Sequence, residues 1–159
     1  MRVHLGLGSN LGDRRENLAR AVELLARVPC VAVVARSSIW ESAPMGPPQP
    51  DFLNAVVTVA TGLTPRLLFQ TCKAIERELG RQPGPRWGPR LVDIDLLLGE
   101  EVVDEPDLKI PHAELHRRAF ALAPLCELDA EAVHPLLGKS LRELLLALGD
   151  QVIRRVGAL

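Results

Sequence analysis

The sequence predicts an α+β fold of the ferredoxin-like class, with βαββαβ order, an antiparallel sheet, helices packed on that sheet and C-terminal helical additions. Two observations favour this class. Strand-like and helix-like segments alternate in that order up to residue 98, and no linker, repeat or low-complexity tract divides the chain. Two helices would cover one face of the sheet and leave the other partly open. Because 159 residues suffice for a substantial core, we expect residues 1–159 to form a single domain.

The first half of the pattern is a strand, a helix and two further strands. Residues 3–8, VHLGLG, predict a strand that ends in a glycine-rich turn. Asp13 and Glu16 have the spacing of a capping box, and apolar residues then recur at helical spacing. The β-branched runs 31–40 and 51–60 predict two strands. ESAPMGPPQP lies between them, and its four prolines predict irregular structure.

The second half is a helix, a loop and a strand. Thr64 and Pro65 predict the start of the helix and Gly80 its end. The apolar face of this helix consists of Leu68, Cys72, Ile75 and Leu79. The loop 81–90, RQPGPRWGPR, is rich in proline and glycine, and the strand 91–98, LVDIDLLL, follows it.

Two more helices are expected beyond this core. Pro111 precedes a helical pattern that starts at about residue 114. Ser140 and Glu143 have capping-box spacing and predict the start of the last helix. The pattern assigns no role to the final twenty residues beyond completing the fold.

Composition and charge exclude several classes of protein. A net charge of −1 and a pI near 6.4 argue against broad nucleic-acid binding or a polybasic membrane surface. The chain lacks an apolar signal core, and its apolar runs are too short to span a bilayer. We therefore expect a cytoplasmic protein, and a monomer because no exposed heptad pattern is evident. Cys30, Cys72 and Cys126 are isolated in apolar stretches, so we expect reduced core residues.

Asp93 and Asp95 are unusual because the strand around them is apolar. Side chains alternate between faces along a strand, so both carboxylates point the same way, about 6–7 Å apart. Val92, Ile94 and Leu96 then point into the core. Two like charges on one face destabilise a strand unless a cation bridges them. This pattern favours a Mg²⁺ site, completed by water and phosphate oxygens, while a solvated strand face is the alternative.

The loop 81–90 supplies cations next to that strand. It contains Arg81, Arg86 and Arg90 with no acidic residue, and Trp87 offers a stacking surface. Arginine favours bidentate phosphate contacts, and an arginine lid beside a metal site is typical of phosphoryl transfer. A solvated basic loop is the alternative. Because neither the Walker A motif nor a complete dinucleotide motif is present, we expect a nucleotide to bind through metal and side chains.

The segment IPHAELHRRAF is the third candidate. His112 and His116 match neither H-E-x-x-H nor its inverse, so zinc is not expected. Arg117 and Arg118 fit an anion contact better. From the residue alone, Phe120 is either packed in the core, which is favoured, or stacked on a ligand ring.

These segments together resemble the 6-hydroxymethyl-7,8-dihydropterin pyrophosphokinase family of the folate pathway. The resemblance rests on LGLGSNLGDR, SSIWESAPMGP, PDFLNAVV, RWGPRLVDIDLLL and IPHAELHRRAFAL. RWGPR followed by D-x-D is highly specific to this family. The resemblance implies a ferredoxin-like core and an ATP-dependent diphosphotransferase. Such an enzyme transfers pyrophosphate from ATP to the hydroxymethyl group of the reduced pterin, with two Mg²⁺ ions, and releases AMP.

The resemblance also implies roles for residues at matching positions. The expected metal ligands are Asp93 and Asp95, and the expected catalytic residues are these two with Arg81 and Arg90. The expected pterin contacts are Ser42, Ala43, Met45, Phe52, Asn54, Trp87 and Phe120, with the pterin ring between Phe52 and Phe120. The expected nucleotide contacts are Glu76, Trp87, Arg90, Leu96, Lys109, His112 and Arg118.

The chain departs from the family pattern in places. Phe52 stands where Tyr is common, Ala43 replaces a common proline, and the arginine loop is one residue shorter. Asp107 occupies a position where a basic ATP contact occurs, with Lys109 as its candidate replacement. These differences concern ATP affinity and loop dynamics. Two alternatives stay open on the residues alone: a non-catalytic ligand-binding module, and a metal-dependent hydrolase that uses Asp93, Asp95 and His112.

Overall fold

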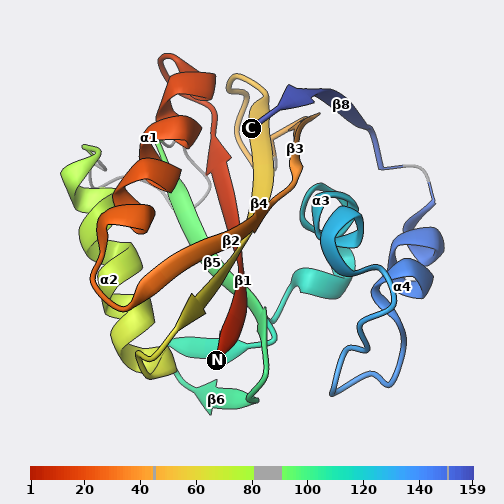
Figure 1. Ribbon diagram of the computed structural model, residues 1–159. Coiled ribbons are helices and arrows are strands. Elements are labelled where there is room, and N and C mark those ends of the chain that lie inside the picture. The colour runs from red at the N-terminus through yellow and green to blue at the C-terminus, as the bar shows by residue number, and fades with distance from the viewer. Residues whose placement is uncertain (45, 81–90, 150) are drawn as a thin grey trace.

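The computed structural model describes residues 1–44, 46–80, 91–149 and 151–159 (Figure 1). In chain order the strands are β1 (Arg2–Ser9), β2 (Val31–Arg36), β3 (Ser38–Ser42), β4 (Phe52–Thr61), β5 (Asp93–Gly99), β6 (Val103–Glu105), β7 (Leu108–Ile110) and β8 (Ile153–Ala158). The helices are α1 (Arg14–Arg27), α2 (Pro65–Glu78), the 3₁₀ helix η1 (Leu115–Arg117), α3 (Ala119–Asp129) and α4 (Leu141–Leu148).

The main sheet has the strand order β5-β1-β4-β3-β8, and β2 also pairs with β4. Each of these pairs is antiparallel. Helices α1 and α2 lie on one face of the sheet, and α3 and α4 lie on the other (Figure 1). The predicted ferredoxin-like α+β fold, with its βαββαβ order and later helical additions, is confirmed.

The predicted strand 31–40 is in fact two strands, and Ser37 separates them. Its backbone N–H donates to the carbonyl oxygen of Val56 at 2.8 Å. Its hydroxyl oxygen accepts from the N–H of Val56, also at 2.8 Å. The hydroxyl of Ser37 thus takes the place of a backbone carbonyl in the hydrogen-bond ladder with β4. β2 and β3 therefore pair with different halves of β4.

The predicted helix starts are confirmed by their caps. The carboxylate of Asp13 accepts from the N–H of Glu16 at 3.1 Å. The hydroxyl of Thr64 accepts from the N–H of Leu67 at 3.2 Å. At α4, Ser140 and Glu143 form both bonds of a capping box. Each cap satisfies backbone donors that have no partner inside the helix.

Two apolar clusters flank the sheet, and β5 contributes to both. Val92, Ile94 and Leu96 are at most 3% exposed and belong to the cluster beneath α1 and α2, as predicted. Leu97 and Leu98 belong to the second cluster, which α3 and α4 cover. The aspartate face of β5 is therefore closed at its C-terminal end by apolar packing and stays accessible at Asp93 and Asp95, which are half-buried.

Some elements differ from the sequence-based expectation. The helix expected at about residue 114 begins as the short η1, and α3 starts only at Ala119. The hairpin of β6 and β7 and the final strand β8 were not predicted. The sequence did not reveal these strands because they are short or mostly exposed, so their apolar periodicity is weak.

The expectation of three core cysteines is wrong for Cys30. It is exposed in the turn between α1 and β2, with a left-handed φ of 67°. Cys72 is fully buried, as expected, and Cys126 is half-buried. An apolar sequence neighbourhood did not reveal that a turn would carry Cys30 outward.

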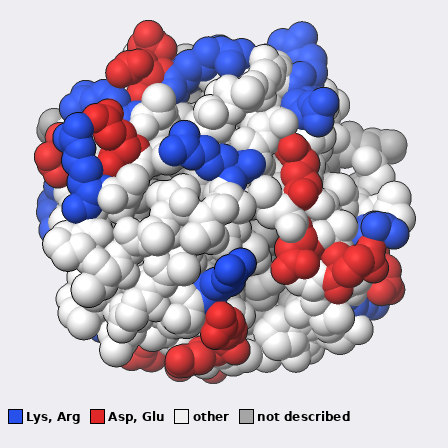
Figure 2. All heavy atoms as spheres, viewed as in Figure 1, with Lys and Arg blue, Asp and Glu red and all other residues white. Residues whose placement is uncertain are grey.

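The surface carries charges of both signs. On the face shown in Figure 2, Lys and Arg are interspersed with Asp and Glu, without a broad patch of one sign. Within the described ranges, no helix combines the length and apolar character needed to cross a membrane.

Candidate active site

A cavity of about 660 Å³ lies at the aspartate face of β5. Strands β1, β3, β4 and β5, helices α2 and α3, and the loop after β7 contribute to its wall. The predicted site residues that line it are Ser42, Ala43, Phe52, Asn54, Asp93, Asp95, Leu96, Lys109, His112, Arg118 and Phe120. Met45, Arg81, Arg86, Trp87 and Arg90 lie outside the described residues.

Two glycines form the floor beside the aspartates. In the β1–β5 register, Gly6 lies opposite Asp95 and Gly8 lies opposite Asp93. A Cβ at Gly6 would lie 3.0 Å from Leu97. A Cβ at Gly8 would lie 3.5 Å from the amide oxygen of Asn54. Side chains at these positions would occupy the aspartate face, so the alternating glycines of LGLG keep it open, a signal that the sequence reasoning left unused.

The carboxylate pair fits a magnesium ion that is bound together with its substrate. Asp93 and Asp95 offer hard oxygen ligands on one face, above the bare glycine floor. Among the described residues, no cluster of three His, Cys, Asp or Glu could enclose a metal. Mg²⁺ characteristically takes one or two carboxylates and completes its shell with water and phosphate oxygens. The donor set therefore suits a metal that arrives with a polyphosphate.

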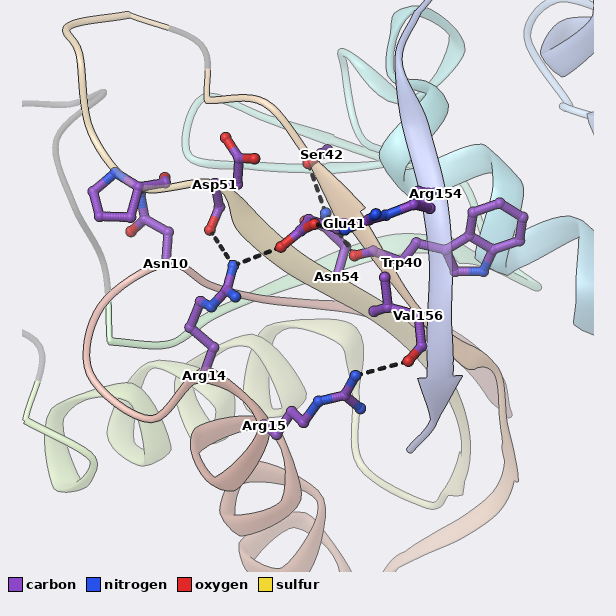
Figure 3. Close-up of polar contacts among 11 residues, drawn as sticks. Asn10, Arg14, Arg15, Trp40, Glu41, Ser42, Asp51, Asn54, Arg154 and Val156 are labelled. Atoms are coloured by element: carbon purple, nitrogen blue, oxygen red, sulfur yellow. Dashed lines mark hydrogen bonds and ion pairs between the residues drawn. The ribbon is translucent and has the colours of Figure 1, made fainter.

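Asn54 is held in one orientation. Its Nδ2 donates to the hydroxyl oxygen of Ser42 at 2.7 Å and to the carbonyl oxygen of Trp40 at 3.3 Å, as Figure 3 shows. These two acceptors fix which end of the amide is the donor, so Oδ1 lies on the side of Gly8, at the cavity wall. A buried amide oriented in this way can recognise the polar edge of a flat heterocycle.

Phe52 and Phe120 both line the cavity, from β4 and α3 respectively. Phe120 also packs at the margin of the second apolar cluster, and the guanidinium carbon of Arg118 lies 5.5 Å from its ring centre. Phe120 thus packs against the core, as favoured on the residue alone, and also lines the cavity. Arg118 brings a cation to the same wall.

The turn after β1 ties down the chain that leads into Phe52. Asn10 is 1% exposed, and its Nδ2 donates to Gln49 Oε1 at 2.8 Å and to the carbonyl of Pro50 at 3.0 Å. Arg14 donates to the carbonyl oxygen of Asp51 at 2.9 Å. Figure 3 shows that Arg14 reaches this point from the start of α1. The sequence predicted an irregular proline-rich loop but not the contacts that fix its end.

Arg14 also belongs to an ion-pair cluster behind Ser42. Glu41 precedes Ser42 in β3, and its carboxylate accepts from Arg14 at 3.1 Å and from Arg154 of β8 at 2.6 Å (Figure 3). The hydrogen bonds from Arg154 and Arg14 hold the pKa of the Glu41 carboxyl below its usual range. The cluster joins the start of α1, β3 and β8 next to the Ser42–Asn54 pair.

The imidazole of His112 lies at the cavity wall and favours its neutral form. Burial lowers its pKa below the usual 6.5, although the negative charge of Asp95 opposes this shift. Its Nδ1 accepts from the N–H of Glu114 at 3.1 Å. In the neutral ring the remaining proton is then on Nε2. His112 can donate one hydrogen bond to an anionic oxygen.

The acidic position at Asp107 is neutralised within the protein. Asp107 lines the cavity, and its two carboxylate oxygens accept from Arg66 at 2.8 and 3.0 Å. Arg66 lowers the pKa of this carboxyl. Lys109, also at the wall, pairs with the exposed Asp104. The pairing with Arg66 reduces the repulsion that Asp107 would exert on a polyphosphate.

Glu76 does not line the cavity with the other described nucleotide candidates. It is 1% exposed, and its carboxylate accepts from the N–H of Ile94 at 2.7 Å. Lys73 donates to the same carboxylate at 3.3 Å and itself lines the cavity. Lys73 is a cation that the sequence reasoning missed, one helical turn before Glu76.

Comparison with known proteins agrees with this geometry. The model of the family described as 7,8-dihydro-6-hydroxymethylpterin-pyrophosphokinase (HPPK) matches residues 4–130. The 2-amino-4-hydroxy-6-hydroxymethyldihydropteridine pyrophosphokinase of Methylorubrum extorquens is 46% identical over 158 residues, which are 98% of this chain and 98% of that protein. The enzyme of the same name from Pseudomonas aeruginosa is 43% identical over 157 residues, 98% of this chain and 96% of its own.

A solved structure supports the fold independently. The HPPK-DHPS protein of Plasmodium falciparum superposes with a TM-score of 0.71 over 92% of this chain at 14% identity. This chain spans 40% of that longer one. At this identity the structural similarity shows the fold alone. The family match and the two bacterial relatives show that the chain shares a common origin with this family. The resemblance noted in the sequence is therefore confirmed, and the chain belongs to the 7,8-dihydro-6-hydroxymethylpterin-pyrophosphokinase family.

Proposed function

We propose that this protein transfers pyrophosphate from ATP to the hydroxymethyl group of 6-hydroxymethyl-7,8-dihydropterin and releases AMP, a step of folate biosynthesis. One observation carries the proposal beside the family membership. A single cavity combines two phenylalanine rings and an oriented amide, suited to a pterin, with a carboxylate pair, suited to Mg²⁺ and phosphates. Neither half alone would specify this reaction.

On the pterin side, Phe52 and Phe120 stack on the two faces of the ring, and Asn54 reads its polar edge. Ser42 keeps the Asn54 amide in position through their 2.7 Å hydrogen bond. Ala43 contributes wall surface. The same set includes Met45 and Trp87 on the strength of family membership alone. The rings exclude water from the hydroxymethyl oxygen. Because this lowers the local dielectric constant, the electrostatic interactions in the site become stronger.

On the phosphate side, Asp93 and Asp95 would hold two Mg²⁺ ions, which would supply positive charge against the phosphates of ATP. Arg118, Lys109 and the neutral His112 contact phosphate oxygens, while Leu96 belongs to the wall on the nucleotide side. Arg81 and Arg90 complete the cationic surround and Trp87 closes over it, again on the strength of family membership. Glu76 belongs with the nucleotide set on that same ground, and its role is tested below.

The reaction is an in-line substitution at the β-phosphorus of ATP. A bond forms between the pterin hydroxymethyl oxygen and that phosphorus as the bond to the α,β-bridging oxygen breaks. AMP departs with that oxygen, and the hydroxyl proton is released. Positioning and charge neutralisation supply most of the rate in such transfers. We propose that the protein acts as a monomer, because the sequence shows no exposed heptad pattern.

The test is a product analysis with a matched pair of variants. Incubation with ATP, Mg²⁺ and the hydroxymethyl pterin should give AMP and the pterin diphosphate in equal amounts. We expect Asp95→Asn to lower kcat by about 100-fold or more and to leave the pterin Kd within about twofold. Glu131→Gln, which alters an exposed carboxylate paired with Arg142 outside the cavity wall, is the control and should keep full activity.

Three results would contradict the proposal. ADP or free phosphate as the main product would indicate a different transferase or a hydrolase. Equal losses of turnover and pterin binding in Asp95→Asn would mean that the carboxylate is structural. A protein that binds pterin but yields no AMP would support the non-catalytic alternative.

A further inference from the structure

Gln151, near the end of the chain, makes hydrogen bonds to the backbone on both sides of the cavity residue Arg118. Its Oε1 accepts from the backbone N–H of Ala119 at 2.9 Å, and its Nε2 donates to the backbone carbonyl of Arg117 at 2.9 Å. Arg118 lies between these two peptide groups and lines the cavity. Gln151 itself is exposed and does not belong to the wall.

The local backbone explains why such a contact is needed. Arg118 joins the end of η1 to the start of α3 and has extended φ and ψ of −121° and 99°. It occupies the N-cap position of α3, but its side chain makes no cap hydrogen bond. The N–H groups of the first helical turn have no acceptor inside the helix. Gln151 supplies an acceptor for the N–H of Ala119, the first residue of α3, from outside the helix. A Ser, Thr, Asp or Asn at the cap would instead accept from the second or third residue of the helix.

The segment that carries Gln151 is itself held on the sheet. β8 pairs with β3, Arg154 pairs with Glu41 at 2.6 Å, and the carbonyl of Val156 accepts from Arg15 at 2.7 Å. Figure 3 shows Arg154 of β8 pointing to Glu41 of β3, and Arg15 of α1 pointing to the carbonyl of Val156 in β8. Gln151 lies two residues before β8. Because β8 is held on the sheet, the position of Gln151 against α3 is held as well.

We propose that Gln151 is a positioning residue for the phosphate side of the site, acting through the backbone on either side of Arg118. It caps α3 and fixes the direction in which the guanidinium of Arg118 leaves the chain. The guanidinium lies 5.5 Å from the centre of the Phe120 ring, so the same contact also orders the first turn of α3 behind that ring. This inference rests on the proposed function of the cavity.

The expected effect follows from the two hydrogen bonds. Their loss frees the backbone on either side of Arg118, and small displacements of a positioned group are costly to turnover. Gln151→Ala should therefore lower kcat/KM for ATP by about tenfold. Gln151→Glu keeps the acceptor for Ala119 and loses the donor to Arg117, so it should recover part of that loss. Gln70→Ala, at an exposed position of α2 outside the cavity wall, is the control.

A double-mutant cycle separates positioning from general stability. In an Arg118→Ala background, Gln151→Ala should change kcat/KM for ATP by less than about twofold, because the group to be positioned is gone. The same tenfold loss in both backgrounds, or a loss of kcat with unchanged KM that follows the fraction of folded protein, would overturn the inference.

Binding of a non-cleavable ATP analogue with Mg²⁺, measured by calorimetry, gives a readout that does not depend on turnover. Gln151→Ala should weaken this binding, and Gln151→Glu should weaken it less. If the wild type makes no AMP, the proposed function fails, whereas the coupling of Gln151 to Arg118 is still decided by the binding cycle. Additive binding losses in that cycle would refute the inference alone.

Discussion

The backbone N–H of Ile94 donates a 2.7 Å hydrogen bond to the buried carboxylate of Glu76. Ile94 stands between the two aspartates of β5, which is the end strand of the sheet and, among the described strands, pairs with β1 alone. A strand in that position leaves every second amide without a sheet partner. α2 provides the missing acceptor, and this contact fixes the strand segment that presents both carboxylates.

Replacement of Glu76 should therefore affect stability before it affects chemistry. Glu76→Ala leaves the buried Ile94 N–H without its acceptor, so the free energy of unfolding in urea should fall by about 2–4 kcal/mol. Glu76→Gln retains an acceptor oxygen and should cost about 1 kcal/mol. Equal losses for both would contradict this role. Unchanged stability with a raised KM for ATP in Glu76→Gln would instead support a direct nucleotide contact.

Removal of the charge on Glu41 should weaken the pterin side selectively. Glu41→Gln abolishes the pairs with Arg14 and Arg154, which tie β3 to α1 and β8 next to Ser42. Partly exposed pairs of this kind contribute up to about 1 kcal/mol each. We expect the pterin Kd to rise by about threefold while the Kd of the Mg²⁺–ATP analogue stays constant.

The control for Glu41 is Glu23→Gln, because Glu23 pairs with Arg27 on the exposed side of α1, away from the cavity. Its pterin Kd should equal that of the wild type. The same rise in both variants would show that overall charge, not the cluster behind Ser42, sets pterin affinity.

Acid should destabilise the fold partly through His134. Its Nδ1 accepts from the N–H groups of Leu136 and Leu137, both at 3.3 Å. Burial first, and then the nearby His116, lower its pKa below the usual 6.5. The unfolded chain thus binds this proton at a higher pH than the folded protein does. The stabilisation by neutral His134 is full above 6.5 and is lost as pH falls through the lowered folded pKa.

His134→Asn keeps an acceptor oxygen but cannot titrate. Its free energy of unfolding in urea should change less than that of the wild type between about pH 7.5 and about pH 5. His116→Asn leaves His134 able to titrate and should retain most of the pH dependence. Identical slopes for the wild type and His134→Asn would rule out His134 as a source of the acid sensitivity.

The three thiols should differ in reactivity. Cys30 is exposed in its turn, whereas burial, with the Glu76 carboxylate nearby, raises the pKa of the Cys72 thiol to about 12. Burial also raises the pKa of Cys126. Because the thiolate is the reactive form, a disulfide reagent at neutral pH should modify one thiol rapidly in the folded protein.

All three thiols should react when the protein is unfolded in urea. Cys30→Ser should remove the rapid phase and leave the slower ones. A rapid phase that persists in Cys30→Ser would show that the region around Cys72 or Cys126 opens more readily than the fold indicates.

Sequence reasoning succeeded where one residue's neighbours along the chain determine the outcome. The capping side chains of Asp13, Thr64 and Ser140 are examples, since a cap acts within three residues. It failed at the split around Ser37, which depends on Val56 of β4. It also failed at Cys30, which lies in a turn, and at β8, whose apolar periodicity is weak. Gln151 and Lys73 lacked any motif that would mark them, although both contribute to the site or its support.

The sequence by itself determined the alternation of strand and helix and the two-sided character of β5. It also determined the family, because periodicity and motif spacing are written in consecutive residues. Only the tertiary structure decided that Gly6 and Gly8 form the floor beneath Asp93 and Asp95. It also decided that Gln151 caps α3 from 32 residues away. Strand register and long-range hydrogen bonds arise from packing that brings distant segments together, and no local pattern specifies which segments will meet.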